Sequence, residues 1–138
     1  MRRRDIDVPS APPQCATLDR MTTNSRVAIV TGAAQGIGRR TAEVLAGQGY
    51  ALALLDLQST SRTRESAADA LELLGDVSSE ADVERMARQV EDRFGRADVL
   101  VNNGPFLLSR AFGRIMLRQG VSALVNVASI AGRPTRHG

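Results

Sequence analysis

The sequence of 138 residues contains very little cysteine and few aromatic side chains. Cys15 is the only cysteine, so an internal disulfide is excluded and a reducing cytoplasm is the expected location. Aromatic residues make up 3% of the chain, so the core has to be built from Ala, Val, Leu and Ile. No apolar run approaches the roughly 18 residues of a transmembrane helix, so we expect a soluble protein with no membrane partner.

Lysine is absent altogether, and arginine alone supplies the positive side of a net charge of +3. The arginines alternate with acidic residues, as in EADVERMARQVEDRFGR (80–96). This pattern is typical of a solvated helix face and not of a basic stripe for nucleic acid. We therefore predict no nucleic-acid partner, and we predict no metal site.

Residues 1–22 differ from the rest of the chain. They hold three of the five prolines and show no sustained hydrophobic period. We interpret them as a disordered tail, or as the result of a start codon placed too far upstream, and we expect one domain over residues 23–138.

From Arg26 onward, short apolar runs alternate with amphipathic segments. This alternation predicts an α/β fold, a doubly wound parallel sheet of about five strands with helices on both faces. The predicted strands are 27–31, 50–57, 71–77, 97–103 and 121–129. The predicted helices are 36–46, a weak one within 61–70, one that Ser79 and Asp82 cap, and 105–119 with Pro105 in its first turn.

A glycine turn in TGAAQGIG (31–38) joins the first predicted strand to the first helix. Gly32 permits a tight turn, Gly36 lets the backbone approach a pyrophosphate, and Gly38 lets the helix pack closely on the strand. The N–H groups and the dipole of the helix start favour bound phosphates. The turn therefore predicts a dinucleotide site.

An acidic residue stands where the ribose of such a dinucleotide would need one. Asp56 ends the second predicted strand, near the distance of roughly 20 residues expected for an acid that binds the adenosine ribose. A carboxylate there repels a 2′-phosphate and favours NAD over NADP. Arg39 and Arg40 weaken this preference, because either is able to neutralise that phosphate.

Other interpretations of the glycine turn are weaker. A nucleoside-triphosphate loop needs a lysine after its last glycine, and the chain has none. A tight turn without a ligand is common, and an acid at the end of a strand is often only a cap. The combination of strand, glycines, helix and acid favours the dinucleotide.

TGAAQGIG (31–38) resembles the TGxxxGIG motif of the classical short-chain dehydrogenase/reductase family. The similarity continues through Asp56, GDV (75–77), DVLVNN (98–103) and LVNVASIAG (124–132). The resemblance implies a Rossmann-like fold that is incomplete at its C-terminal side, a partial NAD(P)-binding domain over 23–138, and hydride transfer between NAD(P) and an alcohol or carbonyl compound.

The resemblance also implies the residues of the site. Asp76 and Val77 would flank the adenine, Asn102 would support the site, and Ser129 matches the catalytic serine that hydrogen-bonds the substrate carbonyl. Asn126 precedes that serine in a structural role. The full set expected to contact the cofactor is Thr31, Gly32, Gln35, Gly36, Ile37, Gly38, Asp56, Asp76, Val77 and Asn102.

The sequence departs from the family at two places. Where the family has NNAG, this chain reads NNGPFLLSRAF (102–112), so a loop, a helix start and a catalytic asparagine are missing. The YxxxK motif expected after Ser129 is also missing: Tyr50 is the only tyrosine, and no lysine is present. His137, in a polar stretch, is expected to be solvated and not a substitute acid. We therefore expect the isolated chain to be catalytically incompetent.

Three interpretations stay open: a truncated and internally deleted family member, an NAD(H)-binding module without catalysis, and an inert gene remnant. The resemblance implies that two further strands and their helices are absent, which leaves the fifth strand as an exposed edge, so we expect low solubility or marginal stability of the isolated chain. The substrate and the oligomeric state cannot be predicted, because the segments that determine them in the family are shortened or missing here.

Overall fold

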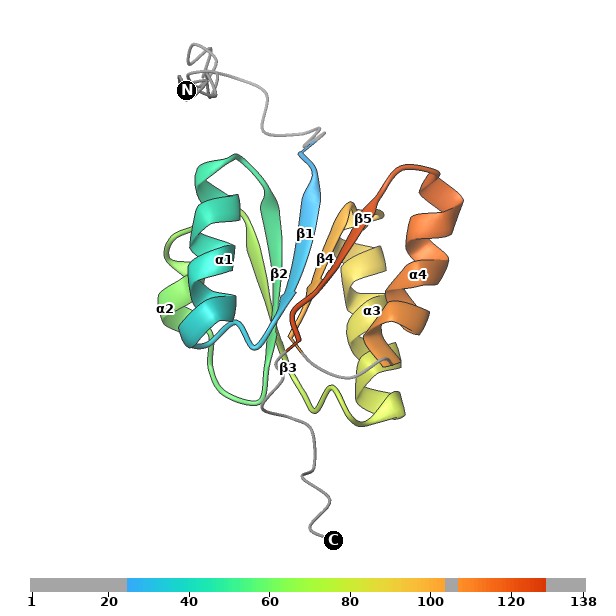
Figure 1. Ribbon diagram of the computed structural model, residues 1–138, viewed down its shortest axis with the longest axis horizontal. Helices are drawn as coiled ribbons and strands as arrows, with labels where there is room; N and C mark the ends of the chain where they lie inside the picture. Colours follow the sequence, from blue (N-terminus) through green and yellow to red (C-terminus); the bar gives the residue numbers. More distant parts are fainter. Residues whose placement is uncertain (1–24, 104–106, 129–138) are drawn as a thin grey trace, which may run out of the picture.

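The computed structural model describes residues 25–103 and 107–128, which form a five-stranded parallel sheet with helices on both faces (Figure 1). The strand order is β3-β2-β1-β4-β5, and every neighbouring pair is parallel. The predicted α/β class and doubly wound sheet are confirmed. In chain order the elements are β1 (Val27–Thr31), α1 (Gly36–Gly47), β2 (Ala51–Asp56), α2 (Ser61–Arg64), β3 (Ala70–Leu74), α3 (Glu80–Phe94), β4 (Val99–Asn102), α4 (Leu107–Gln119) and β5 (Ala123–Asn126).

Two hydrophobic clusters lie on opposite faces of the sheet, because successive residues of a strand point to opposite sides. Ile29 packs in the cluster with α3 and α4, whereas Ala28 and Val30 pack in the cluster with α1. Figure 1 shows α1 and α2 together on one face and α3 and α4 together on the other. The α3/α4 face holds the largest buried side chain, Phe112, and the α1 face is built from Ala, Val and Leu.

Several strands are shorter than the sequence predicted. The run 71–77 was expected to be one strand, but β3 ends at Leu74. Gly75 still donates its N–H to the Asp56 carbonyl at 3.1 Å. The next residue, Asp76, then accepts hydrogen bonds from the N–H (2.8 Å) and the hydroxyl (2.6 Å) of Ser78, which bends the chain into a turn. The predicted helix start at Pro105 lies outside the described residues.

The cap of α3 is confirmed. Ser79 Oγ accepts a hydrogen bond from the Asp82 N–H at 3.4 Å. The Asp82 carboxylate does not complete a reciprocal box with Ser79; it accepts the Asp76 N–H at 2.9 Å instead. This contact ties the loop after β3 to the first turn of α3.

Among the described strands, β5 pairs only with β4, so it forms one edge of the sheet. All four of its residues are exposed, and Leu124 and Val125 each expose nearly half of their surface. The low solubility expected from such an edge stays a prediction. Within the described ranges, no helix is long and apolar enough to cross a bilayer.

Candidate functional site

The carboxyl ends of β1, β2 and β4 meet at one edge of the sheet. Thr31, Asp56 and Asn102 are the last residues of these three strands. β2 pairs with one side of β1 and β4 pairs with the other side. The strand order therefore reverses between β1 and β4. In open α/β sheets, ligands bind in the crevice at such a point.

The glycine turn between β1 and α1 needs glycine at three positions, for different reasons. Gly32 and Gly36 have φ values of 63° and 56°, in the left-handed region that other residues rarely adopt. A Cβ on Gly38 would lie 2.1 Å from the Gly32 carbonyl oxygen, so only glycine lets α1 start this close to β1. A Cβ on Gly36 would meet no described atom within 4 Å, so the backbone there faces open space.

No side chain within the described ranges closes the start of α1. Gln35 occupies the N-cap position, and its side chain makes no capping hydrogen bond within the part of the chain that the structure describes. The first turn, made by Gly36 to Arg39, contains no acidic residue. Since the first N–H groups of a helix have no partner inside it, this end of α1 can receive an anion. Ile37 lies beside it with 67% of its surface exposed.

Asp56 contacts the glycine turn directly. Its Oδ2 accepts the Ala34 N–H at 2.9 Å, and its Oδ1 accepts the Gln58 N–H at 3.0 Å. An ionised carboxylate has about four acceptor positions, so capacity remains for a ligand hydroxyl. The sequence predicted that Asp56 binds a ribose, but it did not predict the hydrogen bond from the Ala34 N–H.

A cavity of about 160 Å³ lies between the turn and the ends of the strands. It brings together four of the predicted residues, Thr31, Gly32, Asp56 and Val77, from three separate segments of the chain. Its complete described lining is Thr31, Gly32, Leu55, Asp56, Leu57, Gly75, Val77 and Asn103. The apolar side chains in this list would suit a flat ring, and the carboxylate would suit a sugar hydroxyl.

Asp76 is close to this cavity, but the hydrogen bonds of its carboxylate serve its own loop. The Ser78 hydroxyl and N–H donate to it and hold its pKa below the ordinary value for an aspartate. Asp76 therefore shapes the loop that carries Val77 into the cavity lining.

The two asparagines at the end of β4 have different roles. Asn102 is buried, and its amide donates to the side-chain oxygen of Asn126 on β5 at 3.2 Å. Asn103 lines the cavity and is hydrogen-bonded to the last residue of β1. Its backbone N–H donates to Thr31 Oγ1 at 2.8 Å, and its side-chain amide donates to the Thr31 carbonyl at 2.9 Å. Of these two residues, the family resemblance implied a site role only for Asn102. The paired asparagines at a strand end were the signal that could have included Asn103, because neighbouring residues of a strand point to opposite faces.

The predicted catalytic Ser129 and the discounted His137 lie outside the described residues. Tyr50 is described, and it lies just before β2, at the amino ends of the strands. Its ring lies 4.6 Å from the Arg26 guanidinium carbon. The single tyrosine of the sequence is therefore at the opposite edge of the sheet from the glycine turn.

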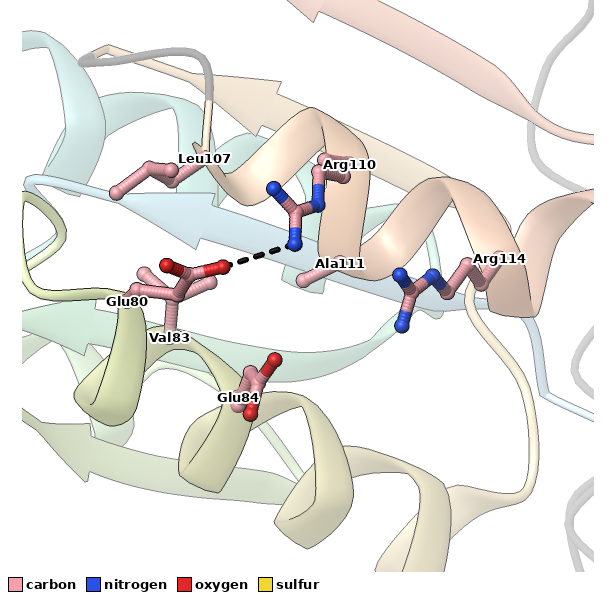
Figure 2. A pocket seen from close by; sticks show the side chains of 7 residues that line it. All are labelled: Glu80, Val83, Glu84, Leu107, Arg110, Ala111 and Arg114. Atoms are coloured by element: carbon pink, nitrogen blue, oxygen red, sulfur yellow. Dashed lines mark hydrogen bonds and ion pairs between the residues drawn. The ribbon is translucent and has the colours of Figure 1, made fainter.

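A second hollow lies between α3 and α4, where Figure 2 shows Glu80 and Glu84 facing Arg110 and Arg114. Arg110 donates to Glu80 at 2.8 Å. The hollow has a volume of about 30 Å³, enough for a water molecule or two and not for a nucleotide. No group of His, Cys, Asp or Glu among the residues that the structure describes could hold a metal ion.

Comparison with known proteins connects this site to one family. The model of the family described as short chain dehydrogenase matches residues 26–104, more than half of the chain. The 1,6-dihydroxycyclohexa-2,4-diene-1-carboxylate dehydrogenase of Pseudomonas putida is 32% identical over 139 aligned positions, covering 78% of this chain and 52% of that enzyme. A short-chain dehydrogenase/reductase of Armillaria gallica is 42% identical over 98 residues, 65% of this chain and 38% of the relative. The chain thus spans about half, or less, of the length of these relatives.

Solved structures agree with the sequence relatives. Levodione reductase superposes with a TM-score of 0.73 at 30% identity, over 79% of this chain and 56% of that one. A metagenomic short-chain oxidoreductase in complex with NADP gives 0.70 at 28% identity, over 78% and 63%. NAD⁺-bound xylitol dehydrogenase gives 0.71 at 30% identity, over 78% and 54%. One of these structures holds NADP and another NAD⁺, so the comparison does not choose between the two cofactors.

Dinucleotide binding is typical of this family, and in open α/β sheets ligands bind at the carboxyl ends of the strands where the strand order reverses. The family expected from TGAAQGIG (31–38) is confirmed by the match to residues 26–104. The chain belongs to the short-chain dehydrogenase/reductase family of NAD(P)-dependent oxidoreductases.

Proposed function

We propose that this chain binds a nicotinamide dinucleotide across the carboxyl edge of its sheet. The observation that carries the proposal is the meeting of the glycine turn, Asp56 and Val77 around one cavity beside the open start of α1. The cavity of about 160 Å³ would hold only part of the ligand, since complete ligand pockets measure about 300–1,000 Å³. The pyrophosphate would lie over the turn, where Gly36 presents bare backbone to open space.

We propose further that NAD is preferred over NADP. Asp56 would accept hydrogen bonds from the adenosine ribose hydroxyls, and its charge would repel a 2′-phosphate. The two arginines able to offset that repulsion are already engaged by one carboxylate: Arg39 bonds to Glu43 at 2.9 Å, and Arg40 bonds to it at 3.1 Å. Glu43 is ionised at neutral pH, and the hydrogen bonds from these two arginines lower its pKa further.

The bound cofactor supplies a nicotinamide ring that accepts or donates hydride. By family resemblance, Ser129 would hydrogen-bond the carbonyl of an alcohol/carbonyl substrate. Hydride transfer also needs a positioned group that moves a proton to or from the substrate oxygen, and such a group contributes about 10²–10⁴-fold. Because Tyr50 lies at the other edge of the sheet, we propose that a polypeptide of these 138 residues binds the cofactor without turning it over. It would then act as a non-catalytic NAD(H)-binding module.

Calorimetric titration with NAD and NADP, and fluorescence titration with NADH, test this function. We expect Gly36→Ala to weaken NADH binding about tenfold, because a residue with a side chain pays about 1–2 kcal/mol to hold a left-handed conformation. Gly47→Ala is the matched control: no described atom lies within 4 Å of its added Cβ, and its affinity should equal that of the parent chain. A folded chain that binds neither dinucleotide refutes the proposal. If the chain turns over a secondary alcohol or ketone, and Ser129→Ala abolishes that turnover, the proposed lack of catalysis is refuted.

A further inference from the structure

The peptide that joins Ala33 to Ala34, in the middle of the glycine turn, is held at both ends. The Ala33 carbonyl accepts a hydrogen bond from Thr63 Oγ1 at 2.7 Å. The Ala34 N–H donates to Asp56 Oδ2 at 2.9 Å. A peptide unit is planar, so fixing its oxygen and its hydrogen fixes its orientation. This orientation sets the path of the chain toward Gly36 and the start of α1.

The bond from Thr63 is buried. Thr63 and Ala33 are both 0% exposed, although 30 residues separate them in the sequence. A buried carbonyl that loses its donor costs about 1–3 kcal/mol, because water does not replace the lost partner. The hydrogen bond from the Thr63 hydroxyl therefore stabilises the turn more than the same bond would at the surface.

Thr63 needs support of its own, because α2 has only four residues and so short a helix does not hold itself together. The support comes from Glu72 on β3. Its Oε2 accepts the N–H of Thr60 at 2.5 Å and the hydroxyl of Thr60 at 2.7 Å. Thr60 is the N-cap residue of α2 and is 1% exposed. Contacts thus run from β3 through the start of α2 to the glycine turn.

We propose that Thr63 is a positioning residue that holds the glycine turn in the conformation that binds the dinucleotide, with Glu72 fixing Thr63 through Thr60. The proposal rests on the proposed function, and it concerns a residue with no direct contact to the ligand. Asp56 contacts the turn and is also expected to bind the ribose, so a substitution there would change both interactions at once. Among the described residues, the Thr63 hydroxyl hydrogen-bonds only to the turn, so its substitution tests the turn contact by itself.

The test compares Thr63→Val, which removes the hydroxyl at nearly constant shape, with Thr63→Ser, which keeps it. Thr41→Val, in the middle of α1, is the matched control, since no described hydrogen bond joins the Thr41 hydroxyl to the turn. Two quantities are measured on the full chain: amide hydrogen exchange of residues 33–38 without ligand, and the NADH dissociation constant. In T63V we expect both the exchange rate and the dissociation constant to rise about tenfold. T63S and T41V should stay within about twofold of the parent chain.

A T63V chain with unchanged exchange in residues 33–38, or a T63S chain as impaired as T63V, overturns the proposal. If circular dichroism shows that T63V is unfolded, Glu72→Gln tests the same series of contacts at a less buried position. E72Q should raise the amide exchange rate of residues 33–38 about threefold and leave the exchange rate of α3 unchanged. If the exchange rates of both segments change by the same factor, or neither changes, the proposal is overturned. A parent chain that binds no NADH refutes the proposed function, and the exchange of residues 33–38 still decides the role of Thr63.

Discussion

Gly38 is the position where a single methyl group should do the most damage. Its Cβ would lie 2.1 Å from the carbonyl oxygen of Gly32, 2.6 Å from its carbonyl carbon, and 2.8 Å from the Thr31 oxygen. All three are backbone atoms, so no side chain can rotate away. To reach 3.4 Å, the lower limit of ordinary contact, the start of α1 would have to move from β1 by about 1.3 Å.

The expected cost of Gly38→Ala follows from two opposing effects. Overpacking costs about 1–3 kcal/mol, and contact with rigid backbone places this site at the upper end. Alanine favours a helix over glycine by about 1 kcal/mol. We therefore expect a net loss of about 2 kcal/mol in the free energy of unfolding, which for a domain of this size lowers Tm by roughly 8–16 °C.

Urea unfolding followed by circular dichroism measures the stability, and NADH titration of the folded fraction measures the site. We expect G38A to lose affinity together with stability, because displacing α1 also moves the N–H groups that would face the pyrophosphate. Gly47→Ala, in the same helix but with no described atom within 4 Å of the added Cβ, should raise the stability by about 0.5–1 kcal/mol. A G38A chain that unfolds at the urea midpoint of the parent chain would refute this reasoning.

Three other substitutions test separate parts of the structure. Glu43→Gln should break the ion pairs of Arg39 and Arg40 and lower the ratio of the NADP to the NAD dissociation constant. An unchanged ratio in calorimetry would contradict the proposal that these pairs keep the arginines from a 2′-phosphate. Burial raises the pKa of Asp98, but hydrogen bonds from Arg96 and the Val27 N–H outweigh it and hold that pKa below its ordinary value. This contribution is complete above the unfolded pKa of about 4 and is lost as the pH falls through the folded value, so the urea midpoint should fall more steeply below pH 4 in the parent chain than in D98N. Asn103→Ala removes the amide that donates to Thr31 and should weaken NADH binding by about 1 kcal/mol; equal affinity would show that the backbone contact suffices.

Local patterns in the sequence were enough to predict the sheet and the glycine turn. The apolar run of β1 and the glycines at 32, 36 and 38 are constrained by their immediate neighbours, and hydrophobic period and turn chemistry record such constraints. The same patterns overextended β3, because the bend after Leu74 depends on the Asp76 carboxylate accepting two hydrogen bonds from Ser78.

The contacts of the glycine turn that sequence reasoning missed join residues that are far apart in the chain. The bond from Ala34 to Asp56 spans 22 residues, and the bond from Asn103 to Thr31 spans 72. No local pattern records which backbone group a side chain will find across the sheet. Family resemblance implied the positions expected to contact a cofactor, but not the residues whose hydrogen bonds hold the turn in place.

The two faces of the sheet differ in the size of the apolar side chains that they bury. On one face α1 packs through small and medium side chains, whereas α3 and α4 bury Phe112, Met86 and Ile115 on the other. Since the stabilisation scales with buried apolar area, we expect the α1 layer to be the less stable cooperative unit and to open before the rest of the domain. The glycine turn belongs to that layer. A dinucleotide bound to the turn would therefore suppress this partial unfolding, and we expect protease resistance to rise with dinucleotide concentration.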